Sequence, residues 1–260
     1  MTRSPKFAGQ FYPMDARELS KTVDCFLNFT QEKQEIKNLR GLIVPHAGYI
    51  FSGIITGAGY GLLQKMIEKP KLIILLGPSH QYPISQPTAA DFEKWETPLG
   101  TVKTDLKALR KLKSVKVINV AHQDEHSLEV QLPFLQRVLN DFKIVPILLN
   151  TPSDKKFIQE LISLLNKEVL IIVSSDLSHY LPYDEAVALD NLANQAIPAL
   201  DVEFVSNQVS ACGREAIITL MEIARQLKWQ GVFFDYKNSG DTFGDKDRVV
   251  GYGCYGFFGD

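Results

Sequence analysis

Hydrophobic residues along the chain form short apolar runs that alternate with segments of helical periodicity. The runs, which predict strands, are Leu42–Val44, Leu72–Leu76, Val115–Val120, Ile144–Leu149, Val169–Val173, Val232–Phe234 and Val249–Phe258. Apolar residues three or four positions apart predict helices over Ala16–Phe29, Ser52–Ile67, Glu125–Leu139, Asp154–Leu165, Tyr183–Ala199 and Cys212–Leu227. Apolar strands separated by helices indicate an α/β fold with a central, mostly parallel sheet that is flanked by helices.

Local signals add detail to the second predicted helix. Ser52 is expected to cap this helix and Pro70 to end it. Gly53, Gly57 and Gly61 recur every fourth residue on one face, which predicts close packing against a neighbouring backbone.

The chain shows no sign of internal division. No linker rich in proline, glycine and serine interrupts it and no internal repeat is visible, so we predict a single domain over residues 1–260. The segment 238–247, rich in glycine and aspartate, predicts a loop before the last strands.

The composition excludes several functional classes. The 260 residues carry 28 lysines and arginines against 30 aspartates and glutamates, a net charge of −2. The sequence therefore lacks the basic surface of a nucleic-acid-binding protein. Its apolar runs are far shorter than the roughly 20 residues that span a bilayer, and no apolar N-terminal stretch resembles a secretion signal. We therefore expect a cytoplasmic protein that binds neither nucleic acid nor membrane.

Four of the candidate site residues follow apolar runs. His46 follows Leu42–Val44, His80 follows Leu72–Leu76, and Asp176 and His179 follow Val169–Val173. In an open parallel sheet, ligands bind at the carboxyl ends of the strands. We therefore expect these side chains to share one rim, although a single histidine after a strand is more often a hydrogen-bonded loop residue.

A thiol is the candidate third ligand of a metal at this rim. Imidazole pairs bind zinc, copper and iron, and two histidines need a further anionic group to hold a divalent ion. Cys212 opens a predicted helix next to Arg214, where the helix dipole and the cation would lower its pKa. A buried structural cysteine is an equal alternative at this position. Cys25 and Cys254 are interpreted as core residues, and three widely spaced cysteines favour reduced thiols over disulfides.

The segment from His122 to His126 matches the H-x-x-E-H signature of a zinc-protease family. That signature requires both histidines on one helix, whereas Asp124 resembles the N-cap of a helix that starts at Glu125. The zinc-protease interpretation is therefore disfavoured. We expect Glu125 and His126 to face the shared rim as supporting or acid/base groups, with His122 as a neighbour at most.

Several short motifs together resemble the Memo family, whose members are similar in fold to the class III extradiol ring-cleaving dioxygenases. In chain order the motifs are Ala8–Pro13, Pro45–Tyr49, Gly77–His80, Glu96–Gly100, Glu125–Glu129, Ser174–His179 and Cys212–Arg214. The resemblance covers nearly the whole chain. It implies an α/β dioxygenase-like fold and a metal site at His46, His80 and Cys212, with Asp176 and His179 alongside.

In the dioxygenases the metal is a non-haem Fe(II) held by two histidines and a carboxylate, and a further histidine acts as acid/base. The resemblance implies that His179 matches this further histidine. This chain offers Cys212 in place of the carboxylate. A thiolate is a softer ligand, which favours Cu(I), Zn(II) or a thiolate-bound iron and puts ring cleavage in doubt. We expect His179, Asp176 and His126 to be the catalytic groups of redox or oxygen-related chemistry.

The resemblance also implies alternatives to an enzyme. Memo proteins are described as copper- or iron-binding redox proteins linked to peptide recognition, and microbial relatives are associated with radical-SAM and AMMECR-type partner proteins. The alternative hypothesis is thus a non-enzymatic metal-binding or peptide-recognition protein acting through partners. The substrate, a small molecule or a peptide, is unknown from sequence.

Overall fold

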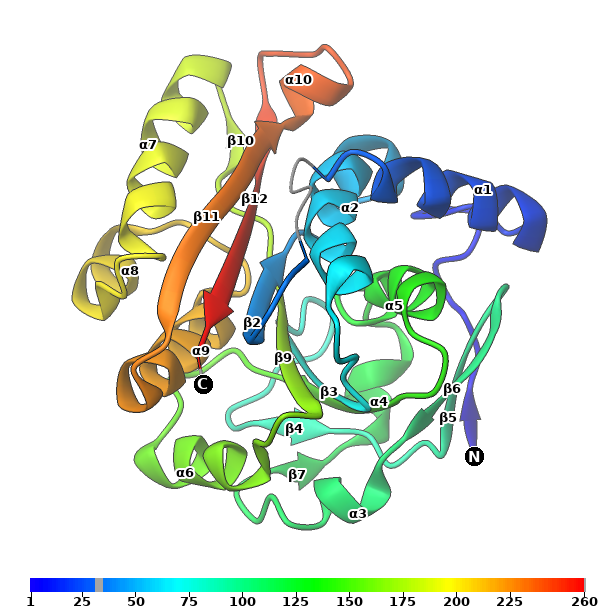
Figure 1. Ribbon diagram of the computed structural model, residues 1–260. Coiled ribbons are helices and arrows are strands. Elements are labelled where there is room, and N and C mark those ends of the chain that lie inside the picture. Colours follow the sequence, from blue (N-terminus) through cyan, green and yellow to red (C-terminus); the bar gives the residue numbers. More distant parts are fainter. Residues whose placement is uncertain (31–34, 260) are drawn as a thin grey trace.

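The computed structural model describes residues 1–30 and 35–259 (Figure 1). Its strands are β1 (Thr2–Arg3), β2 (Leu39–Val44), β3 (Leu72–Gly77), β4 (Thr88–Ala89), β5 (Lys94–Thr97), β6 (Gly100–Thr104), β7 (Lys116–Val117), β8 (Lys143–Leu148), β9 (Val169–Ser174), β10 (His179–Leu181), β11 (Gln230–Asn238) and β12 (Val249–Phe258). Its helices are α1 (Ala16–Leu27), α2 (Tyr49–Lys65), α3 (Leu106–Leu109), α4 (Asn119–Gln123), the 3-10 turn η1 (Glu129–Gln131), α5 (Leu132–Val138), α6 (Lys155–Leu164), α7 (Tyr183–Ala196), α8 (Val202–Gln208), α9 (Arg214–Leu227) and α10 (Ser239–Thr242). The predicted α/β fold is confirmed.

The strands form one mixed sheet whose centre is parallel. The order is β1-β5-β6-β8-β3-β9-β2-β12-β10, with β11 beside β12, and β4 pairing with β7 and β8. Strands β6, β8, β3, β9 and β2 run parallel to their neighbours within this group. Strands β12 and β5 are antiparallel to its two ends. Register places Ile171 of β9 between Ile74 of β3 and Gly41 of β2, so the carboxyl ends of these three strands lie together.

Helices cover both faces of the sheet (Figure 1). Helices α1, α2 and α5 pack against one another on one face, and α6, α7, α8 and α9 lie on the other. Within the described residues, no helix is long and apolar enough to cross a membrane.

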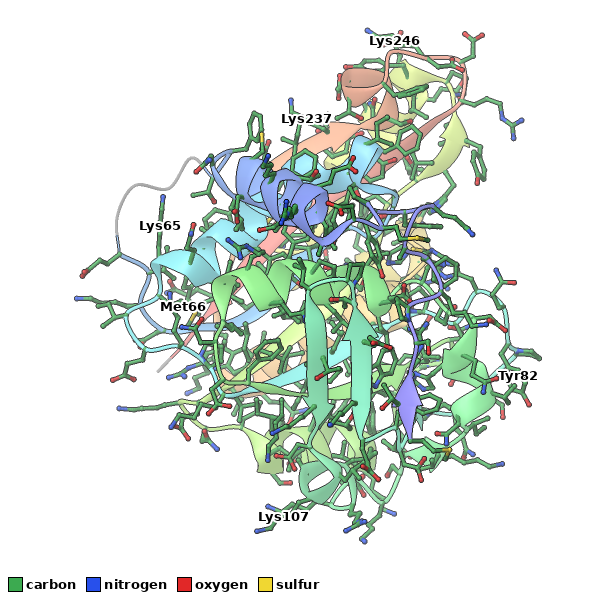
Figure 2. All side chains as sticks on the ribbon, turned by 90° about the vertical axis from the view of Figure 1, so that its right-hand side faces the viewer. Lys65, Met66, Tyr82, Lys107, Lys237 and Lys246 are labelled. Atoms are coloured by element: carbon green, nitrogen blue, oxygen red, sulfur yellow. The ribbon has the colours of Figure 1, made fainter. Side chains whose placement is uncertain are left out.

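The side chains along each central strand alternate between the two faces of the sheet, which divides the apolar core into two clusters. Leu42 and Val44 belong to the cluster under α1, α2 and α5, whereas Ile43, between them, belongs to the cluster under α6 and α9. Successive strand side chains point to opposite faces, which explains this division and the continuous apolar sequence. Figure 2 shows the side chains filling the molecule between Lys107 and Lys246, which lie at its opposite ends.

The glycine face of α2 packs as the sequence predicts. A Cβ atom added at Gly53 or Gly57 would overlap Phe26 of α1, and one at Gly61 would overlap Thr30. The N-terminal limit of this helix differs from the prediction. Gly48, not Ser52, is the N-cap, and the Ser52 hydroxyl lies within the helix and donates to the Ala47 carbonyl (2.9 Å).

The run Val115–Val120 is not the strand that its apolar residues predict. Strand β7 covers only two of its residues, and α4 begins at Asn119, whose side chain binds Asp91 through both its oxygen and its nitrogen (3.0 and 2.7 Å). Val117 and Val120 are exposed. Val115 and Ile118 are only partly buried against the core, so the apolar run is not a buried strand and the pattern misled the prediction.

The prediction of a continuous helix over Glu125–Leu139 is also wrong in its first half. Helix α4 ends before Asp124, which is its C-cap and not an N-cap, and a helical chain resumes only at η1 and α5. The Arg3 guanidinium donates hydrogen bonds to the carbonyl oxygens of His122 (2.6 Å) and Glu125 (2.9 Å). A helix through this segment would need such carbonyls for its own amides. Arg3 therefore favours the irregular backbone that the local pattern cannot reveal.

Smaller differences concern helix ends and a cysteine. Helix α7 ends at Ala196, α9 begins at Arg214, and the predicted loop 238–247 contains the short helix α10. Cys254 is buried in β12 as predicted. Cys25 is exposed, contrary to prediction, because α1 buries the face that carries Leu19, Val23 and Leu27.

Candidate metal centre

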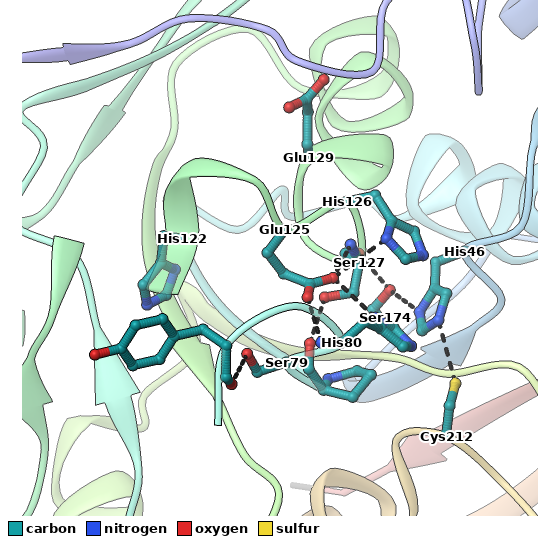
Figure 3. A network of polar contacts seen from close by, with 12 residues as sticks. His46, Ser79, His80, His122, Glu125, His126, Ser127, Glu129, Ser174 and Cys212 are labelled. Atoms are coloured by element: carbon teal, nitrogen blue, oxygen red, sulfur yellow. Dashed lines mark hydrogen bonds and ion pairs between the residues drawn. The ribbon is translucent and has the colours of Figure 1, made fainter. Parts of the chain in front are cut away.

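Three neighbouring strands deliver polar side chains to one rim of the sheet. His46 follows β2, His80 follows β3 and Asp176 follows β9. Strand β9 pairs in parallel with both β2 and β3, so their carboxyl ends are adjacent. Figure 3 shows His46, His80 and His126 gathered at this rim. The structure thus places these residues where the strand pattern predicts.

Three histidines form a compact cluster. His46, His80 and His126 each offer a ring nitrogen, and the three nitrogens all lie within 4.8 Å of one another. The ring centroids are 5.2 Å apart for His46 and His80, 5.3 Å for His46 and His126, and 4.5 Å for the stacked His80 and His126. Imidazole groups so close together form a donor set suited to zinc, copper or iron. Sequence reasoning gave His126 an acid/base role, and the structure places it in the cluster itself.

Glu125 connects two of these histidines. One carboxylate oxygen lies 2.9 Å from Nδ1 of His80 and 3.4 Å from Nδ1 of His126. The other accepts the backbone amide of His80 (2.5 Å). Burial would raise the pKa of Glu125, but the hydrogen bonds that its carboxylate accepts from the ring and the backbone amide of His80 outweigh this effect and lower that pKa to about 2. The carboxylate is therefore ionised and orients both rings, as carboxylates do behind metal-bound histidines.

The environment keeps the inner histidines neutral. His46 is buried, and its burial, followed by the charges of His126 and His80, lowers its pKa well below the ordinary value. Burial likewise lowers the pKa of His126. A histidine binds a metal only through an unprotonated nitrogen. Burial thus supplies the protonation state that a metal site needs.

Cys212 contacts one edge of the cluster. Its Sγ lies 3.2 Å from Nε2 of His46 and 3.3 Å from the amide nitrogen of Asp176, and it is not one of the three clustered groups. The expected lowering of the thiol pKa is not found, because burial and the charge of Asp176 raise it. Arg214 does not help, since its guanidinium faces Glu215. In the protein alone, Cys212 is a thiol.

Asp176 and His179 lie beside the histidine cluster. The Asp176 carboxylate accepts the backbone amide of His46 (2.7 Å). Burial raises the pKa of Asp176, opposed by this hydrogen bond and by positive charge on His179. Among the described residues, no hydrogen bond joins Asp176 to the His179 ring, which is half-buried beside the exposed Tyr180. Asp176 therefore acts on His179 through charge and on His46 through direct contact.

His122 lies outside this centre. Its ring is fully buried, its Nε2 lies 3.1 Å from the carbonyl oxygen of Thr88, and it packs edge-on against Trp95. His122 is in α4 while His126 is in the irregular segment that follows. The two histidines do not share one helix, so the zinc-protease arrangement is absent, as expected from the sequence.

The N-terminal segment forms one wall of the site. Phe11 packs against His126 with the ring centroids 4.6 Å apart, and Phe7 approaches the same ring at 5.5 Å. Both phenylalanines are only partly buried. These rings cover one side of His126, a role that the motif at Ala8–Pro13 did not reveal.

Sequence reasoning missed the buried polar residues that support the histidines. The most connected are Ser174 and Gln131, together with the ion pair of Arg3 and Glu129. Ser174 carried a signal, since it ends an apolar run at the rim. The local sequence pattern does not identify Gln131, Arg3 or Glu129 as supporting residues.

Comparisons with known proteins agree over nearly the whole chain. The family model described as Memo-like protein matches residues 3–255. A MEMO1 family protein of Aquifex aeolicus is 39% identical over 266 residues, covering 96% of this chain and 97% of the relative. Relatives from Ignicoccus hospitalis and Sulfolobus acidocaldarius, both MEMO1 family proteins, are 37% and 36% identical over 286 and 278 residues. They cover 99% and 97% of this chain and 99% and 98% of their own lengths.

Proposed function

Because this chain belongs to the Memo family, and because its histidines converge at one rim, we propose that it is a metal-binding protein with redox or oxygen-related chemistry. The proposed ligands are His46, His80 and His126, with Cys212 as an additional donor on the His46 side. The observation that carries the proposal is the approach of three ring nitrogens to within 4.8 Å of one another.

The chemistry of the donor set supports a transition metal. Two of the rings have their Nδ1 atoms turned to the Glu125 carboxylate, which leaves Nε2 of His80 and His126 for an ion. Nitrogen donors and a thiol suit iron, copper or zinc better than the oxygen-seeking calcium or magnesium. The donors thus fit the non-haem Fe(II) or Cu(I) expected from the sequence, and Zn(II) as well.

A bound iron or copper ion would supply one-electron chemistry and a binding position for dioxygen or substrate. The chain's own groups would act around it. We propose that His179, which is half-buried beside the cluster, exchanges a proton with the substrate as general acid or base. The carboxyl group of Asp176 would interact electrostatically with His179. Phe7 and Phe11 would exclude water from the side of His126 that they cover.

A second function, metal binding without turnover, is favoured by one observation. The Cys212 Sγ lies 3.2 Å from Nε2 of His46, and a soft sulfur donor beside an imidazole suits Cu(I). Under this alternative the same residues would bind copper, and His179 would have no role in catalysis.

The experiment that separates these functions uses nitric oxide as a dioxygen surrogate. The protein is stripped of metal, loaded anaerobically with Fe(II), exposed to nitric oxide and examined by EPR. An iron-nitrosyl signal that is lost in His80→Ala and retained in the control His122→Leu is the expected result. Absence of any such signal from iron-loaded wild-type protein would contradict an oxygen-related function. Tight Cu(I) binding by metal-free protein from the same preparation would then favour the alternative.

A further inference from the structure

Ser174 lies at the centre of a buried hydrogen-bond network behind His46. Its Oγ atom is 3.0 Å from Nδ1 of His46 and 2.6 Å from the carbonyl oxygen of Ser127 (Figure 3). The same Oγ atom is 2.8 Å from Nε2 of Gln131. Ser174, Gln131 and Ser127 are each 0% exposed and His46 is 2% exposed. Bulk water therefore does not compete for these contacts, and each polar atom has to be satisfied by a protein partner.

The orientation of the Gln131 amide follows from its other contacts. Nε2 of Gln131 also lies 2.9 Å from the carbonyl oxygen of Pro45, and the Tyr60 hydroxyl donates to Oε1 (3.0 Å). A carbonyl oxygen can only accept, so the amide nitrogen has to face Pro45. Its second hydrogen is then directed at Ser174. Gln131 is thus a donor to Ser174 and not an acceptor from it.

Counting donors at Ser174 fixes the position of the proton on His46. The hydroxyl has one hydrogen, which goes to the carbonyl oxygen of Ser127, and its oxygen can accept two hydrogen bonds. Gln131 supplies one of these. The third contact, with Nδ1 of His46, is satisfied only when Nδ1 carries a hydrogen and donates it. The neutral ring then has its lone pair on Nε2, the atom that faces the Cys212 sulfur.

We propose that Ser174, held in place by Gln131, is a positioning residue that keeps His46 in the Nδ1–H form and leaves Nε2 free for a metal ion. This inference rests on the proposed metal site, whose binding atom it names. In the opposite tautomer, Nε2–H would point towards the site. Ser174 would then have to donate to Nδ1 and give up its hydrogen bond to Ser127.

Ser127 connects this network to the second histidine. Its backbone amide donates to Oε1 of Glu125 (2.8 Å), the oxygen that also accepts from Nδ1 of His80. Its side chain donates to the Pro78 carbonyl (2.8 Å). The carboxylate fixes His80 in the same tautomer that Ser174 fixes in His46. One short segment therefore contacts the groups that orient two rings, which follow β2 and β3 on either side of β9, each with Nε2 available.

The test is nitrogen NMR of the chelator-treated, metal-free protein labelled with ¹⁵N in its histidines. The His46 signals, assigned by their loss in His46→Gln, are expected to show a protonated Nδ1 and an unprotonated Nε2. A protonated Nε2 in the wild-type protein overturns the proposal whatever the variants do. This measurement on the wild-type protein needs no substitution of Ser174, so it does not depend on whether a Ser174 variant folds.

Substitutions then show whether Ser174 is the cause. Ser174→Ala is expected to transfer His46 partly or fully to the Nε2–H form and to weaken Zn(II) binding by about 10- to 100-fold, the usual effect of removing such a partner. Ser174→Thr keeps the hydroxyl and is expected to restore the tautomer. Ser153→Ala removes a hydroxyl that contacts Thr219 (2.6 Å) and is the matched control.

The outcomes separate the inference from the proposed function. An unchanged tautomer in a folded Ser174→Ala variant overturns the positioning role. A wild-type protein that shows the Nδ1–H form but binds no Zn(II), Fe(II) or Cu(I) overturns the proposed function while supporting the tautomer assignment. Binding of metal by a wild-type protein that shows the Nε2–H form supports the function and overturns the inference.

Discussion

The guanidinium group of Arg3 lies 2.5 Å from the carboxylate of Glu129, and the two residues are 3% and 0% exposed. Glu129 also accepts the amide of Phe7 (2.8 Å) and the hydroxyl of Tyr12 (2.6 Å). This buried pair joins the N-terminal segment to the segment that carries His126. The geometry of the candidate site therefore depends on an interaction between distant parts of the chain.

Breaking this pair is expected to be costly. Glu129→Gln leaves the charge of Arg3 buried without its partner, which typically costs about 3–5 kcal/mol of unfolding free energy. Urea denaturation measures the loss. The matched control is Asp24→Asn, which removes the exposed ion pair with Arg137 (2.8 Å) and is expected to cost less than about 1 kcal/mol. Equal effects of the two substitutions would contradict a structural role for the buried pair.

Glu125 is expected to control metal affinity. In Glu125→Gln the amide presents an NH₂ group to a site where the backbone amide and ring Nδ1 of His80 both donate. We expect Zn(II) binding to weaken about 10- to 100-fold, measured by competition with a chelator. Glu160→Gln, whose carboxylate accepts the amide of Ser114 (2.9 Å) away from the site, is the control. Equal affinity in the two variants would exclude the orienting role of Glu125.

Cys212 is expected to select the metal. Replacing its sulfur with oxygen in Cys212→Ser keeps the side chain small but removes the soft donor beside His46. Cu(I) affinity should therefore fall by about 10-fold or more, with a smaller change for Zn(II). Cys25→Ser changes an exposed cysteine on α1 and is the control. An unchanged preference for Cu(I) over Zn(II) would show that sulfur is not a donor.

Acid is expected to destabilise the fold through His122. Burial lowers the pKa of this histidine from 6.5 to about 3. The unfolded chain therefore takes up a proton below about pH 6.5 that the folded chain does not, and stability falls as the pH falls. Between about pH 7 and pH 5 this histidine alone removes about 2 kcal/mol of unfolding free energy.

His122→Leu tests this pH dependence. The variant lacks the titrating ring, so its unfolding free energy should fall by about 2 kcal/mol less than that of the wild type over the same range. Loss of the contact with the Thr88 carbonyl lowers its stability equally at both pH values. Parallel pH profiles of the two proteins would show that His122 is not held neutral in the fold.

The central strands could be predicted from sequence because their residues are apolar on both faces. Predictions for β3 and β9 agree with the structure to within one residue at each end. The first half of the segment 125–139 could not be predicted, because Arg3, far away in the chain, donates hydrogen bonds to the carbonyl oxygens of Glu125 and of the preceding His122. Local periodicity contains no information on such a contact.

The candidate site was predictable only in part, for a similar reason. His46 and His80 follow strands that are both neighbours of β9, and parallel pairing brings them together. The sequence could not show that His126 completes the cluster, since that depends on the irregular backbone after α4. Ser174 and Gln131 are buried polar residues whose partners come from separate elements, so their function is visible only in three dimensions.

The most direct test of the proposed metal centre is a titration of the chelator-stripped protein with Fe(II), Cu(I) and Zn(II) in separate anaerobic experiments. Wild-type protein should bind one ion per chain. His46→Ala, His80→Ala and His126→Ala should each weaken binding by more than about 100-fold, whereas His122→Leu should leave it unchanged. Binding that persists at wild-type affinity in the triple His46, His80 and His126 alanine variant, or no binding by the wild type, would contradict the proposed centre.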